Sequence, residues 1–397
     1  MYPDDWEELS LGSVAQIFTG GTPSRNTPEY WNGDIPWMSS GEINQRVVRS
    51  VAERITSAGM ANSNARLLAP GTVMMALNGQ GKTRGKVALL GIETTCNQSL
   101  AGIVADGRRL LPEYLFHSLY NQYQDIRNIT GDDARNGLNL GILRSLRVAI
   151  PPLDEQQRIT EVLRSVDEAI AAADDARKQA DATLVTISDE VFTSALTEGA
   201  SAWQKAHLEK MLDKIIDYRG VPPPKADGGI PLLTAKNVRF GYLDFEPREF
   251  IAECDYDSWM RRGLPKPGDI MFTTEAPLGN VAEFPSIKAA LGQRTLTLVP
   301  DTKRLDAKFL KWLLLSKPAQ DLIWSHATGS TAKGIKQRTF RKLIFGFPAL
   351  DEQRRISSLL EEVAAARDRA KGCIDDYGAM KVALLSDLLS GRVRASA

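Results

Sequence analysis

A chain of 397 residues with 43% apolar and 25% charged residues is long enough for two or three globular domains, and this composition excludes a disordered or fibrous protein. The chain has no run of 18 apolar residues, and its acidic start lacks the basic and apolar segments of a signal peptide, so we expect a cytoplasmic protein without a membrane span. Cys96, Cys254 and Cys373 are far apart, which argues against a disulfide framework or a thiolate metal site and predicts buried, small apolar side chains.

The net charge of zero hides an uneven distribution. Residues 153–197 hold 4 Lys and Arg against 10 Asp and Glu, whereas residues 198–349 hold 23 against 17. The rest of the chain is balanced. We therefore expect residues 153–197 to face a protein partner and residues 198–349 to suit nucleic acid.

The first 152 residues have the pattern of a mixed α and β domain. Turn-rich segments separate short apolar runs of strand length, and a polar loop, TGDDARNGLN, precedes the last of them. The expected elements are a short strand or helix over 9–18, a strand in DIPWMSSGEI, strands near 72–76, 86–90, 100–104 and 146–150, and a helix over 112–126.

A long helical segment follows, starting at PPLDEQQRI. Asp154 is a good N-cap after Pro152, and apolar residues then recur at steps of four and three, which is typical of a coiled coil. The same pattern starts again at ALDEQRRI, with Asp351 as N-cap. Three basic residues interrupt the apolar stripes and are expected at solvent-facing edges or beside acids: Arg177, Arg367 and Lys381.

The residues between the two helical segments repeat the order of the first domain. GIPLLTAKNV matches DIPWMSSGEI, LPKPGDIMFT matches LLAPGTVMMA, and ATGSTAKGIK matches ITGDDARNGLN. The chain is therefore a tandem duplication with an α/β (α+β) fold. Its predicted parts are a globular domain over 1–152, a helix over 153–197, a linker with a second globular domain over 198–349, and a helix with a tail over 350–397.

Neither helix can bury its apolar stripe alone, so we expect the two to pack on each other. About ten residues link the first helix to the second domain and reach at most about 35 Å, which favours antiparallel helices related by a pseudo-two-fold axis. A helical span of roughly 50 Å would then separate the two domains by about one to one and a half turns of B-DNA. The coil is expected to act as a ruler.

Several of these segments together resemble one known family. The motifs GGTPSR, EYWNGDIPWMSSGEI, PPLDEQQRI, DYRGVPPPK followed by GIPLLTAKNV, ALDEQRRI and the closing LLSGRVR are similar to those of the specificity subunit of type I restriction-modification systems, over nearly the whole chain. The resemblance implies two target recognition domains, each reading one half of a split, asymmetric site in double-stranded DNA, and two spacer helices that set the gap. GGTPSR in one domain and DYRGVPPPK in the other imply different half-sites.

The resemblance also implies partner proteins that perform the chemistry. Two modification subunits would dock on this chain, supply S-adenosylmethionine and flip an adenine out of each half-site for N6 methylation. Restriction (translocase) subunits would add ATP- and Mg-dependent translocation and cleavage. The chain itself is then expected to be a non-catalytic DNA-binding subunit without a cofactor or metal of its own.

Catalytic motifs in the chain are weak. The segment ALNGQGKT lacks the first glycine of a phosphate-binding P-loop, and no long helix is expected after Thr83. A self-sufficient ATPase would require Lys82→Ala to abolish nucleotide binding. His117, His207 and His326 lie in unrelated contexts, which argues against a metal site or a catalytic triad, and His117 is expected to be a satisfied structural residue.

Candidate DNA contacts are basic and amide residues of the polar loops, because these side chains reach phosphates and base edges. They are Lys82, Arg84, Lys86, Arg135, Asn136 and Asn139 in the first domain, and Lys225, Lys236, Arg239, Arg294, Lys333, Lys336 and Arg338 in the second. The alternative is a non-catalytic scaffold that binds protein or glycan through its duplicated domains. In that case changing Lys333, Lys336 and Arg338 would leave DNA binding unchanged.

Overall fold

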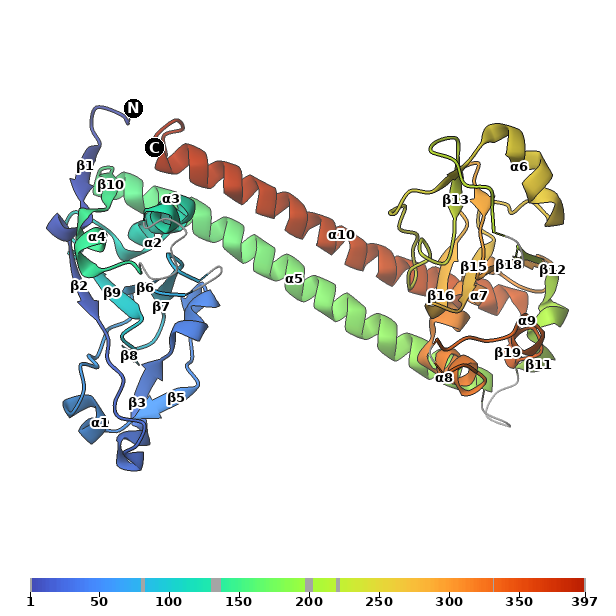
Figure 1. The fold of residues 1–397 in the computed structure, drawn as a ribbon, viewed down its shortest axis with the longest axis horizontal. Coiled ribbons are helices and arrows are strands. Elements are labelled where there is room, and N and C mark those ends of the chain that lie inside the picture. The colour runs from blue at the N-terminus through green and yellow to red at the C-terminus, as the bar shows by residue number, and fades with distance from the viewer. Residues whose placement is uncertain are drawn as a thin grey trace. The chain divides into compact units, whose positions relative to one another are not determined.

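The computed structural model describes residues 2–79, 83–129, 137–196, 203–218, 222–330 and 332–395, and Figure 1 shows its elements. The chain divides into two compact units: unit 1 comprises residues 1–172 and 373–397, and unit 2 comprises residues 173–372. Each unit contains one globular part and a stretch of both long helices. The boundaries expected at 152, 197 and 349 follow the order of segments along the chain rather than this division, and they stay predictions.

Unit 1 is built on a five-stranded sheet. Its elements are β1 (Glu7–Ser10), β2 (Ala15–Thr19), β3 (Trp31–Met38), β4 (Val47–Val48), β5 (Glu53–Ile55), α1 (Ser57–Ala61), β6 (Val73–Ala76), β7 (Val87–Leu90), β8 (Thr95–Cys96), β9 (Leu100–Ala105), α2 (Pro112–Asn121), α3 (Tyr123–Asn128), α4 (Leu140–Ser145), β10 (Arg147–Ile150) and the start of α5 (Leu153–Leu196). The main sheet has the order β2-β9-β6-β7-β4, with β4 and β7 parallel and the other pairs antiparallel. A smaller sheet, β5-β3-β8, and the pair β1-β10 accompany it.

Unit 2 repeats this architecture. Its elements are β11 (Gln204–His207), β12 (Leu212–Asp217), β13 (Ile230–Leu233), β14 (Phe250–Ile251), α6 (Glu253–Trp259), β15 (Ile270–Thr274), β16 (Leu278–Glu283), β17 (Ala290–Leu291), β18 (Thr295–Pro300), α7 (Ala307–Leu315), α8 (Lys317–Ser325), α9 (Gln337–Phe340), β19 (Ile344–Phe347) and the start of α10 (Leu350–Leu389). The main sheet is antiparallel with the order β12-β18-β15-β16, accompanied by β14-β13-β17 and β11-β19.

The duplication predicted from the sequence is confirmed, element by element. β3 and β13, β6 and β15, and α4 and α9 occupy the same positions in the two orders, as the matched segments require. The expected strands near 72–76, 86–90, 100–104 and 146–150 are β6, β7, β9 and β10. Two expectations need correction: residues 9–18 hold parts of two strands, and the helix over 112–126 breaks at Gln122 into α2 and α3.

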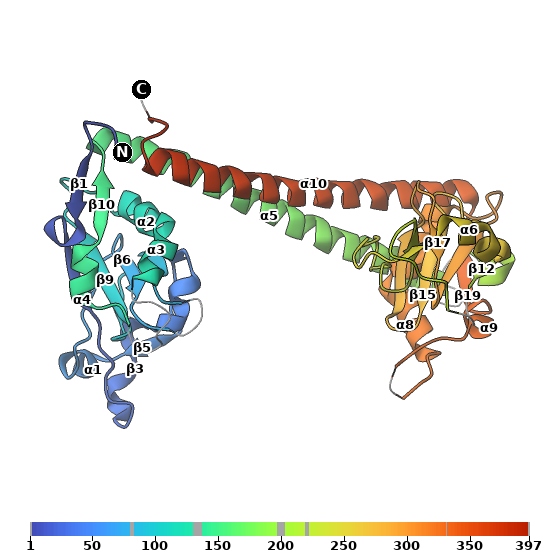
Figure 2. The ribbon, with the colours of Figure 1, turned by 45° about the horizontal axis from the view of Figure 1, so that its top comes forward.

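The two long helices, of 44 and 40 residues, are antiparallel. In unit 1 Asp167 of α5 bonds Lys381 of α10, and in unit 2 Asp181 of α5 lies 4.0 Å from Arg367, so residue numbers rise along one helix as they fall along the other. Figure 2 shows the helices in a second view. The apolar stripe is fully buried next to the globular parts, as at Leu163 and Leu360, and only half-buried toward the middle of each helix. In the middle of the helices, a pair of helices covers only part of each apolar stripe, and the rest of the stripe faces water.

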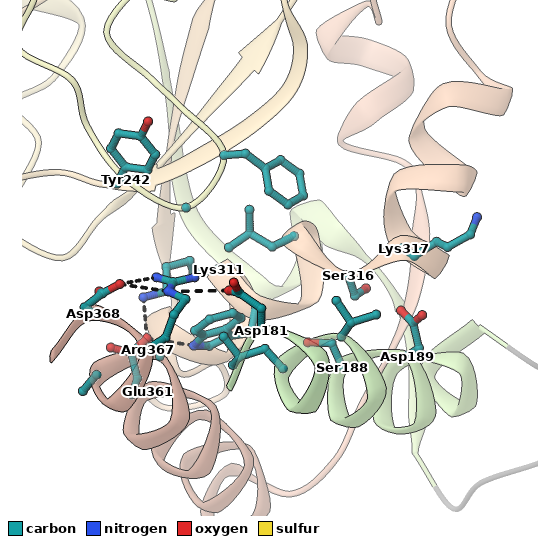
Figure 3. Close-up of a pocket in the computed structure, with 18 of the residues that line it drawn as sticks. Asp181, Ser188, Asp189, Tyr242, Lys311, Ser316, Lys317, Glu361, Arg367 and Asp368 are labelled. Atoms are coloured by element: carbon teal, nitrogen blue, oxygen red, sulfur yellow. Dashed lines mark hydrogen bonds and ion pairs between the residues drawn. The ribbon is translucent and has the colours of Figure 1, made fainter. Parts of the chain in front are cut away.

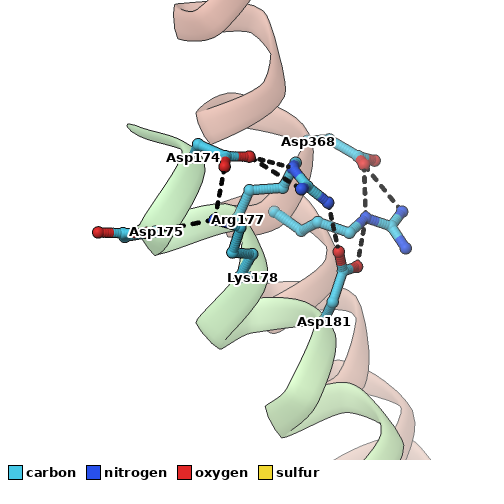
Figure 4. A network of polar contacts seen from close by, with 7 residues as sticks. Asp174, Asp175, Arg177, Lys178, Asp181 and Asp368 are labelled. Carbon is cyan, nitrogen blue, oxygen red and sulfur yellow. Dashed lines mark hydrogen bonds and ion pairs between the residues drawn. The ribbon is translucent and has the colours of Figure 1, made fainter. Parts of the chain in front are cut away.

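The basic residues that interrupt the stripes lie beside acids, as predicted. Figure 4 shows Arg177 between Asp174 and Asp181, to which its guanidinium nitrogens lie 2.8 and 2.9 Å away. Arg367 of α10 lies 4.0 Å from Asp181. These pairs are exposed and salt-screened, and such pairs stabilise a helix only slightly. Lys381 differs, because it is only 5% exposed and its ammonium is bonded to an acid of α5.

One glutamine of each LDEQ motif fastens a globular part to its helix. Gln156 is fully buried; its Oε1 accepts from the Leu111 N–H at 2.8 Å, and its Nε2 donates to the carbonyls of Arg109 and Pro151 at 2.7 and 2.8 Å. Gln353 repeats the three bonds in unit 2, each at 2.9 Å, with Asp306, Arg304 and Pro348. The repeated motif is therefore a structural clamp as well as a helix start.

Two expectations about single residues are wrong in part. Cys96 is buried, and burial raises the pKa of its thiol to about 12, but Cys254 and Cys373 are exposed on helices α6 and α10. His117 is buried, yet its Nδ1 lacks a hydrogen-bond partner among the described residues, so it is not a satisfied histidine. Among the residues that the structure describes, no helix is long and apolar enough to cross a membrane. Among the same residues, no group of His, Cys, Asp and Glu side chains could hold a metal ion.

Candidate nucleic-acid interface

The loops of unit 1 gather at one end of its main sheet. Because neighbouring strands are antiparallel, β2 and β6 end where β7 and β9 begin. Backbone bonds then join the loops: the Leu77 N–H donates to the Ser99 carbonyl and the Leu138 N–H to the Leu77 carbonyl, both at 2.9 Å. We call residues 20–27, 77–79, 83–86, 97–99 and 137–139 the loop edge of unit 1.

The same two bonds build the loop edge of unit 2. The Thr274 N–H donates to the Arg294 carbonyl at 3.0 Å, and the Ile335 N–H donates to the Thr274 carbonyl at 2.9 Å. The edge comprises residues 275–277, 292–294, 327–330 and 332–336. By these bonds Ser99 corresponds to Arg294, Asn78 to Glu275 and Asn139 to Lys336.

The GGTPSR segment is held tightly at the loop edge of unit 1. A Cβ added to Gly20 would lie 2.0 Å from the Cys96 carbonyl oxygen, so only glycine fits. The Gly21 N–H donates to the same carbonyl at 2.9 Å. The Arg25 guanidinium lies 3.6 Å from the centre of the Trp31 ring and pairs with a neighbouring glutamate, so this segment forms a rigid platform.

The predicted contacts of unit 1 divide into three groups. Lys86 and Asn139 lie at the loop edge, where the Lys86 ammonium donates to the Asn44 Oδ1 at 2.6 Å and Asn139 caps α4 by accepting from the Ile142 N–H. Arg84 is buried, and its guanidinium donates to the carbonyl of Arg127, so its position does not favour a contact with DNA. Three predicted contacts lie outside the described residues: Lys82, Arg135 and Asn136.

In unit 2 the loop edge brings Arg294 together with Lys333 and Lys336, which lie in a later loop, and all three are exposed. Arg294 is paired with Glu275, with 3.1 Å between Nε and Oε1. Within the residues that the structure covers, no ion pair engages Lys333 or Lys336. These two ammonium groups are therefore available to phosphates.

The other predicted contacts of unit 2 lie on separate structures. Lys225 and Lys236 share the carboxylate of Glu249, at 2.8 and 3.2 Å, and Lys225 holds the pKa of that carboxyl below its usual range with help from Lys236. Arg239 pairs with an acid on its own loop. Arg338 is exposed on α9, beside a hollow of about 420 Å³ that His326 and Lys342 also line.

Sequence reasoning missed Asn78 and Glu275, which occupy equivalent positions at the two loop edges. Glu275 directly follows β15, and Asn78 lies two residues after the end of β6, the strands of the matched segments LPKPGDIMFT and LLAPGTVMMA. The signal was present in the alignment of the two copies. Neither residue is basic, and a basic side chain is the usual sequence signal of a DNA contact.

The segment that resembles a P-loop connects two neighbouring strands. ALNGQGKT starts at the end of β6, and strand β7 follows soon after Thr83, whereas a phosphate-binding P-loop leads into a helix. Residues 80–82 of this segment lie outside the described part. The described strands therefore indicate a loop between two strands and not a nucleotide-binding P-loop.

Unit 2 also has a groove between its globular part and the long helices. Figure 3 shows Tyr242 on one side, Ser188 and Asp189 of α5 on another, and Glu361, Arg367 and Asp368 of α10 below. Its volume is about 1190 Å³. Phe240 and Tyr242 line it and are 55% and 61% exposed, so the groove offers aromatic surface beside the acidic helix.

Comparisons with known proteins agree with this geometry. The family model of the type I restriction modification DNA specificity domain matches residues 3–180 and 263–371. The type I restriction enzyme MjaVIII specificity subunit of Methanocaldococcus jannaschii is 20% identical over 413 residues, covering 99% of this chain and 94% of that protein. The EcoR124I/EcoR124II specificity subunit of Escherichia coli is 28% identical over 170 residues, 41% of each chain. A solved S subunit of a type I restriction-modification system from M. genitalium shares the fold, with a TM-score of 0.61, 15% identity and 96% of each chain covered.

Proposed function

The chain belongs to the type I restriction-modification specificity subunits, whose function is DNA sequence recognition, and we propose that each of its units reads one half of a bipartite, asymmetric site. One observation carries this proposal. The same backbone bonds build a loop edge in each unit, but the side chains presented there differ: Asn78, Ser99 and Asn139 in one, and Glu275, Arg294 and Lys336 in the other. The two units share the backbone of the loop edge but present different hydrogen-bond donors and acceptors on it, which suits the recognition of two different DNA sequences.

All predicted contacts except the buried Arg84 remain in this proposal. Lys333, Lys336 and Arg338 supply charge for phosphates in unit 2, and Lys225, Lys236 and Arg239 stay candidates that would first leave or share an acidic partner. In unit 1, Lys86 and Asn139 are candidates together with Lys82, Arg135 and Asn136. Unit 1 has no surplus of basic residues, so its affinity for DNA depends more on partner subunits.

The antiparallel helices α5 and α10 set the gap between the half-sites in this proposal. Inserting one heptad into both helices, near Arg177 and near Arg367, adds about 10 Å of helix, or about three base pairs of DNA. The recognised site should then keep both half-sites and gain about three undefined base pairs. An unchanged gap would contradict the proposal that the length of the two helices sets the spacing of the half-sites.

Modification subunits are the proposed partners on the groove of unit 2. The acidic surplus of residues 153–197 excludes DNA from α5 and suits a basic protein surface, and exposed Phe240 and Tyr242 supply apolar contact area. Phe240→Ser with Tyr242→Ser should release the modification subunit that docks on this groove and so lower the amount of modification subunit that co-purifies. Leu264→Ser is the matched control, because Leu264 is 61% exposed in the same unit and does not line the groove. The two modification subunits would supply S-adenosylmethionine, and restriction subunits would supply the ATP- and Mg-dependent steps.

Methylome sequencing tests the central proposal. A host carrying this chain with its modification subunit should show a methylated motif of two unlike half-sites with an undefined gap, absent from a host that lacks the chain. Exchanging residues 1–152 for those of a relative should change one half only. If purified complex binds DNA without sequence preference, or if the triple change at Lys333, Lys336 and Arg338 leaves DNA binding intact, a scaffold that binds protein or glycan becomes the better account.

A further inference from the structure

The loop edge of unit 2 carries an ion pair whose two members come from different loops. The Arg294 Nε lies 3.1 Å from the Glu275 Oε1, and the two side chains are 56% and 46% exposed. Among the residues that the structure describes, neither side chain has a second polar partner. The remaining guanidinium N–H groups and carboxylate lone pairs therefore face outward for a ligand.

The backbone has an unusual conformation at Arg294 and next to Glu275. Arg294 and Ala276, which adjoins Glu275, are two of the three non-glycine residues with positive φ in the described chain, at +65° and +49°. L-residues adopt this conformation rarely, and it persists where the surroundings hold it. Here the Thr274 N–H and hydroxyl both donate to the Arg294 carbonyl, at 3.0 and 3.2 Å.

The loop before α9 supports Glu275 from the other side. Gly334 forms a β-bridge with Glu275, and a Cβ on Gly334 would lie 3.0 Å from the Glu275 Cβ. Any larger residue would crowd the glutamate. The Glu275–Arg294 pair is therefore supported by two neighbouring loops. Such support is needed where a group must bind its ligand in one orientation.

We infer that Glu275 and Arg294 together read one G·C base pair in the half-site of unit 2. An arginine donates two hydrogen bonds to O6 and N7 of guanine, and a glutamate accepts from N4 of cytosine, so the pair matches both bases of one pair in the major groove. A phosphate clamp is disfavoured, because the Glu275 carboxylate repels phosphate. Lys333 and Lys336, without acidic partners in the described part, serve the backbone instead. This inference rests on the proposed function.

The equivalent position of unit 1 supports a role in specificity. There Asn78 and Ser99 replace Glu275 and Arg294 on the same backbone bonds. An amide pairs with adenine at N6 and N7, and a serine hydroxyl accepts or donates. The two units therefore present different base preferences at one structural position.

The test compares four variants of the full chain in complex with its modification subunit: Glu275→Gln, Arg294→Lys, and the controls Glu246→Gln and Arg248→Lys. The control pair is an ion pair of 2.9 Å in the same unit, 67% and 70% exposed. The readout is the methylated motif and the binding of duplexes with each base pair of the half-site replaced. Glu275→Gln and Arg294→Lys should reduce discrimination at a single G·C pair roughly 10- to 100-fold, while the controls leave the motif unchanged.

Arg294→Lys separates base reading from charge, because lysine keeps the charge but loses the planar fork. If Arg294 only contacts a phosphate, this variant keeps the whole motif and the inference is overturned, while the bipartite motif itself still stands. A fifth variant, Arg294→Gln, removes the charge. If it weakens binding to all sequences alike and lowers the salt dependence of binding, the inference is also overturned. Equal unfolding midpoints and equal complex formation for all variants exclude misfolding as the cause.

Discussion

The two units repeat a backbone but differ in the charged groups that join the globular part to the long helices. In unit 1 the acid is Asp167 of α5, which bonds Arg46 of the globular part at 2.7 Å and Lys381 of α10. In unit 2 the acid is Glu361 of α10, and its basic partner is Lys311 of α7. A buried ion pair thus recurs with different residues on different helices.

This difference separates what the fold requires from what it tolerates. The glutamine clamp and the backbone bonds of the loop edge satisfy buried polar groups, and both recur in the two units. If one partner is lost, the other is left buried without a hydrogen bond to water or to protein, which is destabilising. The ion pairs at Asp167 and at Glu361 both neutralise a buried lysine, but they do so with different residues in the two units. Changes that break the shared features should therefore cost more than changes at the divergent ones.

The largest effect is expected at the glutamine clamp. Gln156→Ala and Gln353→Ala each remove three hydrogen bonds from buried groups and should lower the free energy of unfolding by about 4 kcal/mol. Urea unfolding measures the loss, and hydrogen exchange assigns it to unit 1 or unit 2. Gln157→Ala, next to the clamp but exposed, is the matched control and should change little. Similar losses from Gln157→Ala and Gln156→Ala would refute the clamp.

A pH dependence confined to unit 1 should come next. Burial lowers the pKa of His117 to about 4, with Lys381 and Arg46 adding to the effect and Asp167 opposing it. The unfolded state takes up the proton first, so stability is complete above about pH 6.5 and falls by about 3 kcal/mol as pH drops to 4. Trp312 holds the same place on α7 and does not titrate.

Hydrogen exchange as a function of pH measures this contrast. Strands of unit 1 should lose protection between pH 6.5 and 4, and His117→Gln should remove most of that loss. An equal loss in the His117→Gln variant would assign the pH dependence to other groups.

The tail after α10 should contribute less. Arg394 pairs with Asp5 and with Glu155, which is only 2% exposed, and Trp6 also donates to Glu155. Arg394→Ala should lower the melting temperature by about 5 °C at pH 7, whereas Arg392→Ala, which removes an exposed pair of the same tail, should not.

The effect of Arg394→Ala should shrink in acid. Its hydrogen bond holds the pKa of Glu155 below the usual range, so the stability it contributes is present above about pH 4.3 and is lost as pH falls through the lowered pKa. Thermal scans from pH 7 to 3 test this trend. A constant difference between variant and parent would show that the ion pair is not responsible.

The smallest effect is expected on the exposed helix surface. Lys178 pairs with Asp174 and Asp175 within α5, at 2.8 and 3.5 Å, and lies open to solvent. Lys178→Ala should change the melting temperature by no more than about 1 °C, because solvent and salt screen such pairs. A larger change would imply that this segment contacts another surface.

The duplication and the coiled-coil stripes could be predicted from the sequence, because they depend on local periodicity. The helix starts were predicted to within one residue: α5 begins at Leu153 and α10 at Leu350, so Asp154 and Asp351 lie in the first turn and are not the N-caps that the sequence predicted. The sequence also predicted most strands, since short apolar runs between turns are local signals. Which loops share an edge could not be predicted from the sequence, because it depends on the antiparallel strand register that places Glu275 beside Arg294. The burial of Gln156, Lys381 and His117 also could not be predicted from the sequence, because the partners of a buried polar residue come from distant segments of the chain.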